Sequence, residues 1–454
     1  MSALVIIGGS DAGISAALRA KEVDPSADVK ILLADSFPNY SICGLPFYLS
    51  GEVSDWRTLA HRTLEEIERQ GVQLLLGYKV TRIEPASKTV NALDAAGKLQ
   101  TRKFDKLIIA TGASSVRPSF KGTDLQGVFF LRWMDDSFSI HRYIVEHQPQ
   151  RAVILGSGYI GMEMADALTR RGISVTVLAR SGRLLKTVDR EMGDFIDNEL
   201  SKHSVKVVKG IAVTSIERNG RNLAIANSQN LRIEGDMVLV ATGAQPETSI
   251  AMGTGISIGL QGAIRVNRAM ETSVPGIYAA GDCVETWHRI TNKYTYLPLG
   301  TTAHKQGRVA GENAVGGHAE FAGSLGTQVV KIFDLVMART GLLEDEALEA
   351  GFDPVSIDHE AWDHKLYYLG AKSLMIRITG DRKTHRLLGA QIAGPYGAEV
   401  SKRIDIFATA IFNRMTVDSL NHLDLSYTPP LSSPWDPVQM AAQAWIGKAV
   451  RKFA

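Results

Sequence analysis

The chain of 454 residues is too long for a single hydrophobic core and predicts roughly three domains of ordinary size. Its 45% hydrophobic and 22% charged residues are typical of a globular protein, and the net charge of +2 gives no general argument for nucleic acid or a membrane as a partner. No apolar run is long enough for a membrane span. The start of the chain lacks a signal-peptide pattern, and its two cysteines, Cys43 and Cys283, form no zinc motif. A cytoplasmic protein without a metal site is expected.

The first strong pattern is an apolar strand over Leu4–Ile7, followed by a glycine-rich turn, a helix over Ile14–Ala20 and a second strand over Val29–Leu33. The turn reads Gly8-Gly9-Ser10-Asp11-Ala12-Gly13, and the second strand leads to Asp35. This order predicts a dinucleotide-binding unit, in which helix-terminal amides meet a pyrophosphate and the acid meets ribose hydroxyls. Ser10 departs from the fingerprint, because glycine is usual at this position.

Cys43 follows eight residues after Asp35, in the segment Tyr40-Ser41-Ile-Cys43-Gly-Leu-Pro46-Phe-Tyr48. An extended chain spans about 3.3 to 3.6 Å per residue, so this segment can lead from the adenosine end of a dinucleotide toward its reactive ring. Ser41 is a candidate N-cap and Pro46 suits a first helical turn, which would place the sulfur near the positive end of a helix and stabilise a thiolate. The alternative is a buried cysteine that acts as a small hydrophobic side chain.

A second glycine-rich turn repeats the pattern as Gly156-Ser-Gly158-Tyr159-Ile160-Gly161, with a helix to about Arg171 and a strand over Ser174–Leu178. Two such units predict two dinucleotides, one a flavin and the other a nicotinamide nucleotide. Ala179 stands where an NAD-binding unit would place its ribose acid, and Arg180 and Arg183 follow. Guanidinium groups suit a 2′-phosphate, so NADPH is expected. If the arginines are only solvated loop charges, NADH is possible as well.

Three further segments suggest how the domains are connected. Two strands end alike, at Thr111-Gly112 and at Thr242-Gly243, and each resembles a crossing between domains. A third apolar strand runs into Gly281-Asp282, which alone would be an ordinary turn. After residue 325 the pattern changes to strands over Leu374–Ile378 and Leu387–Ala393 and a helix over Val400–Phe412. This last part has no nucleotide motif and suits a dimerisation domain.

Together these motifs resemble the pyridine nucleotide-disulfide oxidoreductases over nearly the whole chain. The resemblance implies an α/β fold with two Rossmann-like dinucleotide-binding domains, for FAD and NAD(P)H, and a C-terminal α+β dimerisation domain. The implied boundaries are residues 1–115 for the first part of the FAD domain, 116–245 for the NAD(P)H domain, 246–324 for the second part of the FAD domain and 325–454 for the interface domain. A homodimer follows from the last of these.

The resemblance also implies the residues that hold each cofactor. Asp282 would bind the flavin ribityl chain, and a helix N-terminus at residues 298–302 would cover the flavin ring, with His304 either a proton donor or a structural residue. The residues expected to bind FAD are Gly8, Gly9, Ser10, Asp11, Ala12, Gly13, Asp35, Ser36, Val80, Ala110, Thr111, Gly112, Gly281, Asp282, Pro298, Leu299, Gly300, Thr301 and Thr302. Those expected to bind NAD(P)H are Gly156, Gly158, Tyr159, Ile160, Gly161, Arg180, Arg183, Thr242 and Gly243.

The lone Cys43 is similar to that of the family branch that contains coenzyme A-disulfide reductases, NADH oxidases and NADH peroxidases. Tyr48 occupies the position of the second cysteine in dithiol members, so Cys43 needs an external partner. Coenzyme A disulfide is the first expectation, with coenzyme A as substrate or covalent adduct. Asp11 replaces the histidine of the peroxidase and oxidase members, which favours sulfur over oxygen.

The alternatives are persulfide or polysulfide reduction, an NAD(P)H oxidase that uses a Cys43 sulfenic acid, and an electron-transfer flavoprotein that reduces a protein partner. No sulfurtransferase pattern is appended, so nothing in the sequence specifically favours persulfide.

The substrate residues are expected from position and from the resemblance. Arg19, Lys21 and Arg62 would receive the phosphates of coenzyme A, with Ser41 beside the thiol, although the same charges occur on any surface helix. Two C-terminal stretches resemble those whose tyrosines reach the cysteine of the partner subunit in coenzyme A-disulfide reductases. The candidates are Tyr367, Tyr368 and Tyr427, and the alternative for each is amphipathic packing.

Overall fold

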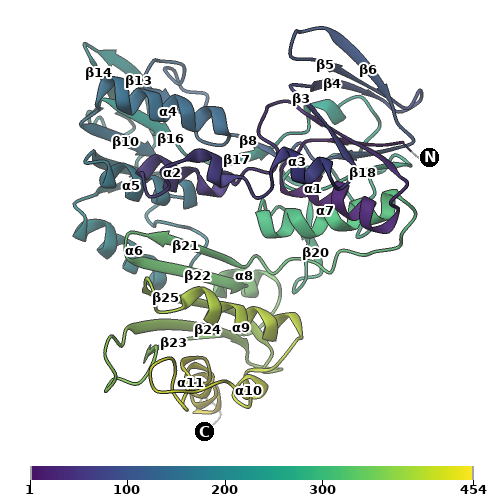
Figure 1. Cartoon of the computed structure of the whole chain (residues 1–454). Coiled ribbons are helices and arrows are strands. Elements are labelled where there is room, and N and C mark those ends of the chain that lie inside the picture. The colour runs from purple at the N-terminus through teal and green to yellow at the C-terminus, as the bar shows by residue number, and fades with distance from the viewer. Residues whose placement is uncertain (1–2, 452–454) are drawn as a thin grey trace.

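The computed structural model describes residues 3–451 and forms three regions, two built on parallel sheets and one on an antiparallel sheet (Figure 1). The first region has a five-stranded parallel sheet in the order β18-β7-β1-β2-β3. Its strands are β1 (Ala3–Ile7), β2 (Asp28–Leu33), β3 (Val72–Leu76), β7 (Lys106–Ile109) and β18 (Ile277–Ala279). Helices α1 (Asp11–Val23) and α7 (Gly300–Ala314) lie side by side against it, although they are far apart in the chain.

Smaller elements complete the first region. They are the 3-10 helices Ile42–Gly44, Trp56–Leu59, Ser249–Ala251 and Leu260–Gly262, the short helices α2 (Leu45–Ser50) and α3 (Leu64–Glu68), a three-stranded sheet of β4 (Lys79–Glu84), β5 (Thr89–Leu93) and β6 (Leu99–Lys103), and a hairpin of β19 (Thr286–His288) and β20 (Lys293–Thr295). Of these, α2 packs against helix α5 of the second region. The segment that carries Cys43 therefore joins the two nucleotide units.

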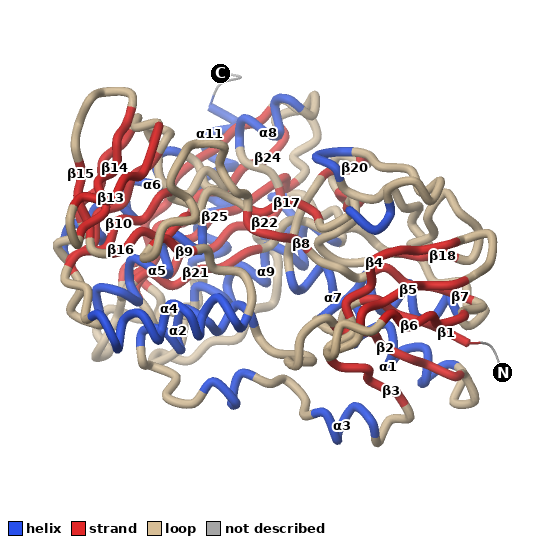
Figure 2. Tube along the Cα trace, turned by 90° about the horizontal axis from the view of Figure 1, so that it is seen from above, coloured by secondary structure: helices blue, strands red, loops and turns tan. Residues whose placement is uncertain are grey.

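The second region repeats the parallel architecture in the order β12-β11-β10-β16-β9. Its strands are β9 (Val128–Phe129), β10 (Arg151–Leu155), β11 (Ser174–Ala179), β12 (Lys206–Lys209) and β16 (Met237–Val240), and its helices are α4 (Met134–His147), α5 (Tyr159–Arg170) and α6 (Arg190–Lys202). A three-stranded sheet of β13 (Val213–Asn219), β14 (Asn222–Asn227) and β15 (Ile233–Gly235) is added. The two crossing segments form a ribbon, β8 (Ala113–Ser115) with β17 (Ala244–Pro246), between the two parallel sheets (Figure 2).

The third region is an antiparallel sheet in the order β21-β22-β25-β24-β23. Its elements are β21 (Gln328–Ile332), β22 (Leu335–Gly341), α8 (Glu344–Glu349), β23 (Pro354–Trp362), β24 (Ser373–Asp381), β25 (Leu387–Pro395), α9 (Val400–Phe412), α10 (Val417–Leu420) and α11 (Pro437–Arg451). Helix α9 packs on β22 and β25, whereas α11 packs on β23 and β24. The sequence predictions of Leu374–Ile378, Leu387–Ala393 and Val400–Phe412 are confirmed as these elements.

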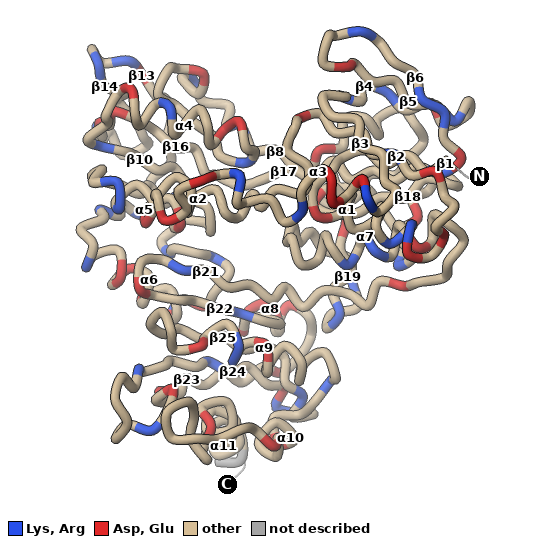
Figure 3. The backbone as a smooth tube through the Cα atoms, in the orientation of Figure 1, with Lys and Arg blue, Asp and Glu red and all other residues tan. Residues whose placement is uncertain are grey.

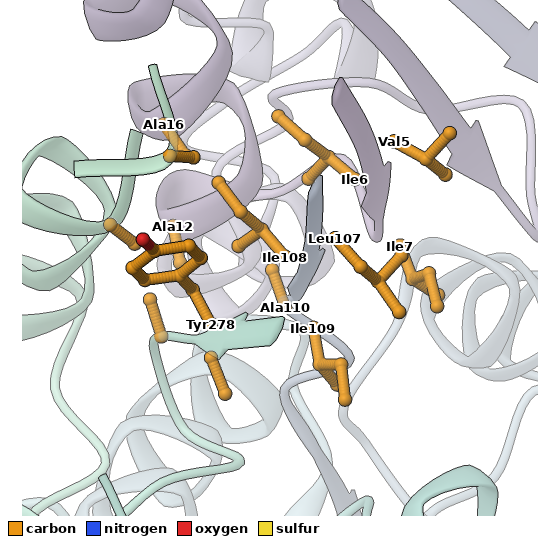
Figure 4. Close-up of a cluster of buried hydrophobic side chains, with 14 of the residues drawn as sticks. Val5, Ile6, Ile7, Ala12, Ala16, Leu107, Ile108, Ile109, Ala110 and Tyr278 are labelled. Carbon is orange, nitrogen blue, oxygen red and sulfur yellow. The ribbon is translucent and has the colours of Figure 1, made fainter. Parts of the chain in front are cut away.

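The core of the first region explains why its strands are continuous apolar runs. Both faces of a parallel sheet are covered, so successive side chains on either face are buried. Val5, Ile6 and Ile7 of β1 are all buried and lie beside the buried residues of β7 (Figure 4). Tyr278 of β18 packs near Ala12 on α1, where small side chains let helix and sheet approach closely.

Acidic and basic positions are interspersed over all three regions of the described part of the chain (Figure 3). Among the described residues, no helix combines the length and the apolar character that a membrane crossing would require.

Candidate active site

Both nucleotide units begin with the same backbone turn after their first strand. Gly8 has a φ of 106° and Gly156 a φ of 121°, in a region that only glycine adopts readily. A Cβ at Gly8 would lie 2.1 Å from the carbonyl oxygen of Ala110, and a Cβ at Gly156 would lie 2.1 Å from that of Ala241. The backbone at the end of the strand before each crossing segment therefore leaves room only for glycine at the first position of each turn.

The third glycine of each turn is fixed by helix packing. A Cβ at Gly13 would lie 1.9 Å from the carbonyl oxygen of Gly8, and one at Gly161 would lie 2.3 Å from that of Gly156. Each helix can begin directly above its strand only without these side chains. The turns therefore aim the first amides of α1 and α5 away from the sheet, as anion binding at a helix N-terminus requires.

The middle position of the turn does not require glycine for backbone reasons, which explains why Ser10 can occupy it in the first unit. Gly158 is extended, with a φ of −81°, and a Cβ there would meet no protein atom within 4 Å. Ser10 is also extended, with a φ of −94°. The backbone therefore tolerates a side chain at this position, and only the space left for a ligand favours glycine.

A cavity of about 1770 Å³ lies where the three regions meet. It is large enough for a dinucleotide ring system together with a substrate. Many predicted site residues line it: Asp11, Arg19, Ser41, Cys43, Arg62, Gly158, Tyr159, Ile160, Gly243, Pro298, Leu299, Gly300, Thr301 and Thr302. The structure thus brings together residues from both glycine-rich turns, the cysteine segment and the start of α7.

Other predicted residues lie outside the lining of this cavity. Those of the first unit are Gly8, Gly9, Ser10, Ala12, Gly13, Asp35, Ser36, Val80, Ala110, Thr111, Gly112, Gly281 and Asp282. Those of the second unit are Gly156, Gly161, Arg180, Arg183 and Thr242. The cavity lining thus includes part of each glycine-rich unit together with Cys43, and the remaining predicted cofactor residues lie beyond it.

Cys43 lies in a 3-10 turn, Ile42–Gly44, that leads directly into α2. Pro46 is in the first turn of α2, as predicted, and Ser41 precedes the 3-10 turn, but its hydroxyl makes no capping hydrogen bond. The thiol is exposed to the cavity, whereas the second cysteine, Cys283, is buried. The prediction that Cys283 is a core residue is confirmed.

Cys43 lies at the start of α2, as predicted, but the protein groups around it disfavour the thiolate that the helix end was expected to stabilise. Its pKa is raised, because the cavity wall desolvates it and the carboxylates of Glu163 and Asp11 oppose a negative charge. Arg132 acts in the opposite direction, with a smaller effect. Although the Cys43 side chain is exposed to the cavity, the surrounding protein atoms remove enough water to disfavour its charged form.

Asp282 is held by Arg132, whose guanidinium donates to its carboxylate. The backbone carbonyl of Asp282 accepts a hydrogen bond of 2.9 Å from the hydroxyl of Tyr296. The Nε of Arg132 is buried and has no acceptor among the described residues. An orphaned donor beside the acid that would bind the ribityl chain fits a polar ligand atom at this point, so the residues present fit FAD.

Asp35 follows β2 and accepts a hydrogen bond of 2.8 Å from the backbone amide of Phe37. Burial raises the pKa of its carboxyl, and the amide of Phe37 opposes this effect. A partly buried acid at the end of the second strand suits the ribose hydroxyls of a nucleotide.

The start of α7 forms another wall of the cavity, as predicted for the helix over the flavin ring. Its N-cap is Leu299, and a Cβ at Gly300 would lie 3.0 Å from a carboxylate oxygen of Asp11. One turn later, the Nδ1 of His304 lies 2.7 Å from the hydroxyl oxygen of Ser15. The pKa of His304 is lowered by burial and then by Arg308 and Lys305, so it favours the neutral form.

The first two turns of α5 contribute two side chains to the cavity. Tyr159 accepts a hydrogen bond of 3.2 Å from the hydroxyl of Thr187, and burial raises its pKa. Glu163 lies one turn further along the same face, since residues four apart on a helix are neighbours. Burial, and then the charge of Asp166, raise the pKa of Glu163 to about 7.

Sequence reasoning missed Glu163 and Arg132. Glu163 had a usable signal, because its spacing from Tyr159 puts both on one face of the helix that follows the second glycine turn. Arg132 had none, because its relevance depends on contact with Asp282, 150 positions away in the chain.

Among the expected substrate residues, the structure separates Lys21 from the others. The ammonium group of Lys21 donates to the carbonyl oxygens of Pro25 and Ala27, and the residue does not line the cavity. Arg19 lines the cavity, but its guanidinium pairs with Glu312 at 2.6 Å and with Glu22.

The three tyrosines lie on the surface of the C-terminal region and outside the cavity of their own chain. Tyr367, Tyr368 and Tyr427 are 74%, 48% and 45% exposed. Partial desolvation and then the neighbouring hydroxyl of Tyr367 raise the pKa of Tyr427. Leu366, Leu369, Leu431 and Trp435 are also exposed in the same two stretches, which gives this surface an apolar character.

A cavity between two Rossmann-type units, with a single thiol on its wall, defines a flavin- and nicotinamide-dependent oxidoreductase that acts on sulfur. The pyridine nucleotide-disulphide oxidoreductase model matches residues 2–307, and the dimerisation-domain model of the same family matches residues 327–437. The chain belongs to the pyridine nucleotide-disulphide oxidoreductase family and is a flavoprotein disulfide reductase. FAD and NAD(P)H are its cofactors, and its C-terminal region is a dimerisation domain.

Similar proteins include NAD(P)H sulfur oxidoreductase (CoA-dependent) from Pyrococcus abyssi, 35% identical, with 97% of each chain covered. Coenzyme A disulfide reductase from Staphylococcus aureus is 29% identical and covers 97% of this chain and 99% of its own. Among solved structures, the reduced CoADR-RHD of Bacillus anthracis has a TM-score of 0.96 at 32% identity, and covers all of this chain and 81% of its own.

Proposed function

We propose that the protein is an NADPH-dependent reductase of a sulfur–sulfur bond carried by coenzyme A, with coenzyme A disulfide as its first substrate. The observation that carries this proposal is the placement of Cys43. It is the one cysteine exposed to the cavity among the described residues, and the position of a second redox cysteine is occupied by Tyr48, which is buried and stacks on His141.

In the proposed reaction, the Cys43 thiolate attacks one sulfur of coenzyme A disulfide. The sulfur–sulfur bond of the substrate breaks, a mixed disulfide forms between Cys43 and one coenzyme A, and the other leaves as a thiolate that takes a proton. Bound FAD supplies the chemistry that carries the two electrons of NADPH to this mixed disulfide, which regenerates the Cys43 thiolate and releases the second coenzyme A. The balance is one disulfide, one NADPH and one proton in, with two coenzyme A thiols and NADP⁺ out.

The cavity offers groups for the protons and for the phosphates of this substrate. Glu163, with a pKa of about 7, is suited to exchange a proton near neutral pH. Arg62, Lys305 and Arg308 line the cavity on the side of α7, where anionic phosphates would be attracted. Arg308 also pairs with Glu22, at 3.1 Å, and Arg19 pairs with Glu22 and Glu312, so these two arginines are available to phosphates only if those pairs open.

The second copy of a homodimer would complete the site. Tyr367 and Tyr427 lie together on an exposed apolar surface that is remote from the cavity of their own chain. A hydroxyl delivered from the partner subunit to the departing sulfur would stabilise the thiolate.

NADPH is proposed over NADH because of residues 179–186. An engineered water-forming NADPH oxidase that is 26% identical carries Ala, Arg and Ser in place of consecutive Asp, Ala and Met, and Arg in place of a Pro five residues further on. This chain has Ala179, Arg180 and Ser181, with Lys186 five residues further on. Arg180 is exposed after β11 and has no ion pair among the described residues, so it is free to meet a 2′-phosphate.

Reduction of a coenzyme A persulfide is a second candidate for the same thiol. The relatives that are 34% to 36% identical are named as CoA-dependent sulfur oxidoreductases and as a coenzyme A polysulfide/persulfide reductase. The relatives named as coenzyme A disulfide reductases are 27% to 29% identical.

Product stoichiometry distinguishes the two candidates. Coenzyme A disulfide yields two coenzyme A thiols for each NADPH, whereas coenzyme A persulfide yields one thiol and one hydrogen sulfide. We expect higher kcat/KM with the disulfide, and at least a 10³-fold loss with both substrates in Cys43→Ser. Cys283→Ser, which changes the buried cysteine, is the matched control and should keep its activity.

Intact mass provides an independent test. A reducible adduct of coenzyme A mass, present in the purified protein and absent from Cys43→Ser, supports the mixed disulfide. A Cys43→Ser protein with full activity would refute the thiol mechanism and favour an electron-transfer flavoprotein.

A further inference from the structure

A second, smaller pocket lies in the C-terminal region, away from Cys43. It has a volume of about 440 Å³ and is formed where the hairpin between β24 and β25 meets the turn between α9 and α10. Its basic lining residues are Lys383, Arg386 and Arg414, and its acidic ones are Asp353 and Asp381. None of these residues has a role in the proposed reaction.

Arg386 is the unusual member of this group. Its Nε is buried without an acceptor, and its guanidinium has no hydrogen bond or ion pair with any residue that the structure describes. Four other arginines, Arg132, Arg339, Arg382 and Arg403, also have a buried Nε without a hydrogen bond, but each guanidinium contacts a carboxylate or carbonyl oxygen. An entirely unpartnered guanidinium that is partly buried is costly unless an anion meets it.

The charges around Arg386 increase this cost. Burial, and then the positive charges of Arg414 and Arg289, lower the pKa of Arg386, and the carboxylate of Asp381 opposes them with a smaller effect. Arg414 has no ion pair within residues 3–451, whereas Arg289 is satisfied by the carbonyl oxygens of Phe412 and Ala322. Figure 3 shows Lys and Arg segments close together between α9 and α10. Two free guanidinium groups therefore share one pocket.

The acidic residues of the pocket offset these positive charges only in part. One carboxylate oxygen of Asp381 accepts from the backbone amide of Asp353 at 3.0 Å, and the other accepts from the amide of Thr384 at 3.1 Å and from its hydroxyl. Asp353 pairs with Arg382 at 3.5 Å. Neither carboxylate forms an ion pair with Arg386 or Arg414, and the three basic residues of the lining outnumber its two acidic ones, so a net positive charge remains.

We propose that this pocket binds a tetrahedral oxyanion of the phosphate class between Arg386 and Arg414, with Lys383 at its rim. A guanidinium presents two parallel N–H donors that match the oxygens of such an anion, and the anion would remove the repulsion between the two arginines. Inorganic phosphate and the phosphate group of a larger metabolite share this chemistry.

The test uses the FAD-loaded protein without NADPH or coenzyme A. Isothermal titration with inorganic phosphate, and thermal unfolding in phosphate against chloride at equal ionic strength, should show binding and a rise in Tm. Arg386→Gln and Arg414→Asn should each weaken this binding at least tenfold. Asparagine is chosen because residue 414 has a φ of 57°, which asparagine tolerates.

The controls separate this pocket from other causes. Arg62→Gln, on the main cavity, and Arg232→Gln, which pairs with Glu234 on the surface, should keep the phosphate response. In chloride, Arg386→Gln should be at least as stable as the parent, because the repulsion is removed. A merely structural arginine would instead lower Tm in both salts.

The inference is overturned if phosphate has no effect beyond that of chloride, or if both variants respond as the parent does. Glycerol 3-phosphate serves as the probe for a phosphate monoester. Tighter binding of this compound assigns the pocket to a phosphorylated metabolite, and tighter binding of inorganic phosphate assigns it to the free ion.

Discussion

The two nucleotide units share one backbone design and differ in the side chains at and just after the end of the second strand. Gly8 and Gly156 approach a carbonyl oxygen of the crossing strand with the same geometry, and β10, α5 and β11 repeat the order of β1, α1 and β2. The amide of Gly8 donates to the carbonyl oxygen of Leu32, and that of Gly156 donates to the carbonyl oxygen of Leu178, so Leu33 is the counterpart of Ala179. Asp35 lies two residues beyond this point in the first unit, whereas Arg180 follows it directly in the second. The backbone thus specifies that a dinucleotide binds, and a few side chains specify which one.

The cavity shows a second difference between the units. The first turn of α1 contributes Asp11, and the second turn of α5 contributes Glu163, so each unit places one carboxylate near Cys43. Both raise the pKa of the thiol, and Glu163 has the larger effect of the two. One carboxylate from each nucleotide unit therefore influences the same thiol.

The largest expected effect comes from the first glycine of each turn. Gly8→Ala and Gly156→Ala should each cost about 3 kcal/mol or more, because the new Cβ meets a backbone carbonyl at a φ that alanine rarely adopts. Gly8→Ala should lose FAD, whereas Gly156→Ala should keep FAD and lose nicotinamide binding. Flavin absorbance and urea unfolding measure these outcomes. Gly158→Ala, at an extended position with open space, is the matched control, and a similar loss of stability there would contradict the argument.

The next effect concerns cofactor choice. Ala179→Asp restores a ribose acid to the second unit, where its charge should repel the 2′-phosphate of NADPH. The ratio of kcat/KM for NADPH to that for NADH should fall at least tenfold, equivalent to about 1.4 kcal/mol. Asp35→Ala should instead weaken FAD retention and leave this ratio unchanged. If the ratio is unaltered in Ala179→Asp, residue 179 does not determine the preference for NADPH over NADH.

The third effect compares the two carboxylates. Glu163→Gln and Asp11→Asn should both lower the pKa of Cys43, Glu163→Gln by more, because each removes a negative charge that opposes the thiolate. The rate of alkylation by iodoacetamide as a function of pH reports this pKa. If Asp11→Asn lowers the pKa of Cys43 by more than Glu163→Gln does, the expected ranking of the two carboxylates is wrong.

Glu163 also links stability to pH. Its pKa is raised from 4.5 to about 7 in the folded protein, so its favourable contribution is fully present below pH 4.5 and is lost as the pH rises through 7. Glu163→Gln should remove this dependence.

The smallest effect is expected at the middle position of the first turn. Ser10→Gly should change stability by only a few tenths of a kcal/mol, because Ser10 is extended and its hydroxyl makes no capping hydrogen bond. FAD content should stay the same. A marked loss of FAD would mean that the serine hydroxyl contacts the cofactor.

Much of the fold was predictable because its signals are local. The strand at Leu4–Ile7, the helix at Val400–Phe412 and both glycine turns are confirmed by contiguous segments of the structure. The identity of Cys43 as the exposed cysteine also followed from adjacent motifs. Its electrostatics did not, because they depend on Glu163 and Arg132, which the fold brings from other parts of the chain.

The sequence by itself determined that two dinucleotide units flank a lone cysteine, because steric rules make glycine spacing and apolar periodicity readable within short segments. Only the tertiary structure decided which charges surround that cysteine, that Arg132 holds Asp282, and that Arg386 faces Arg414 without a partner. These features depend on pairs of residues that are far apart in the chain. Their energies depend on burial and on distance, and a short segment of sequence specifies neither quantity.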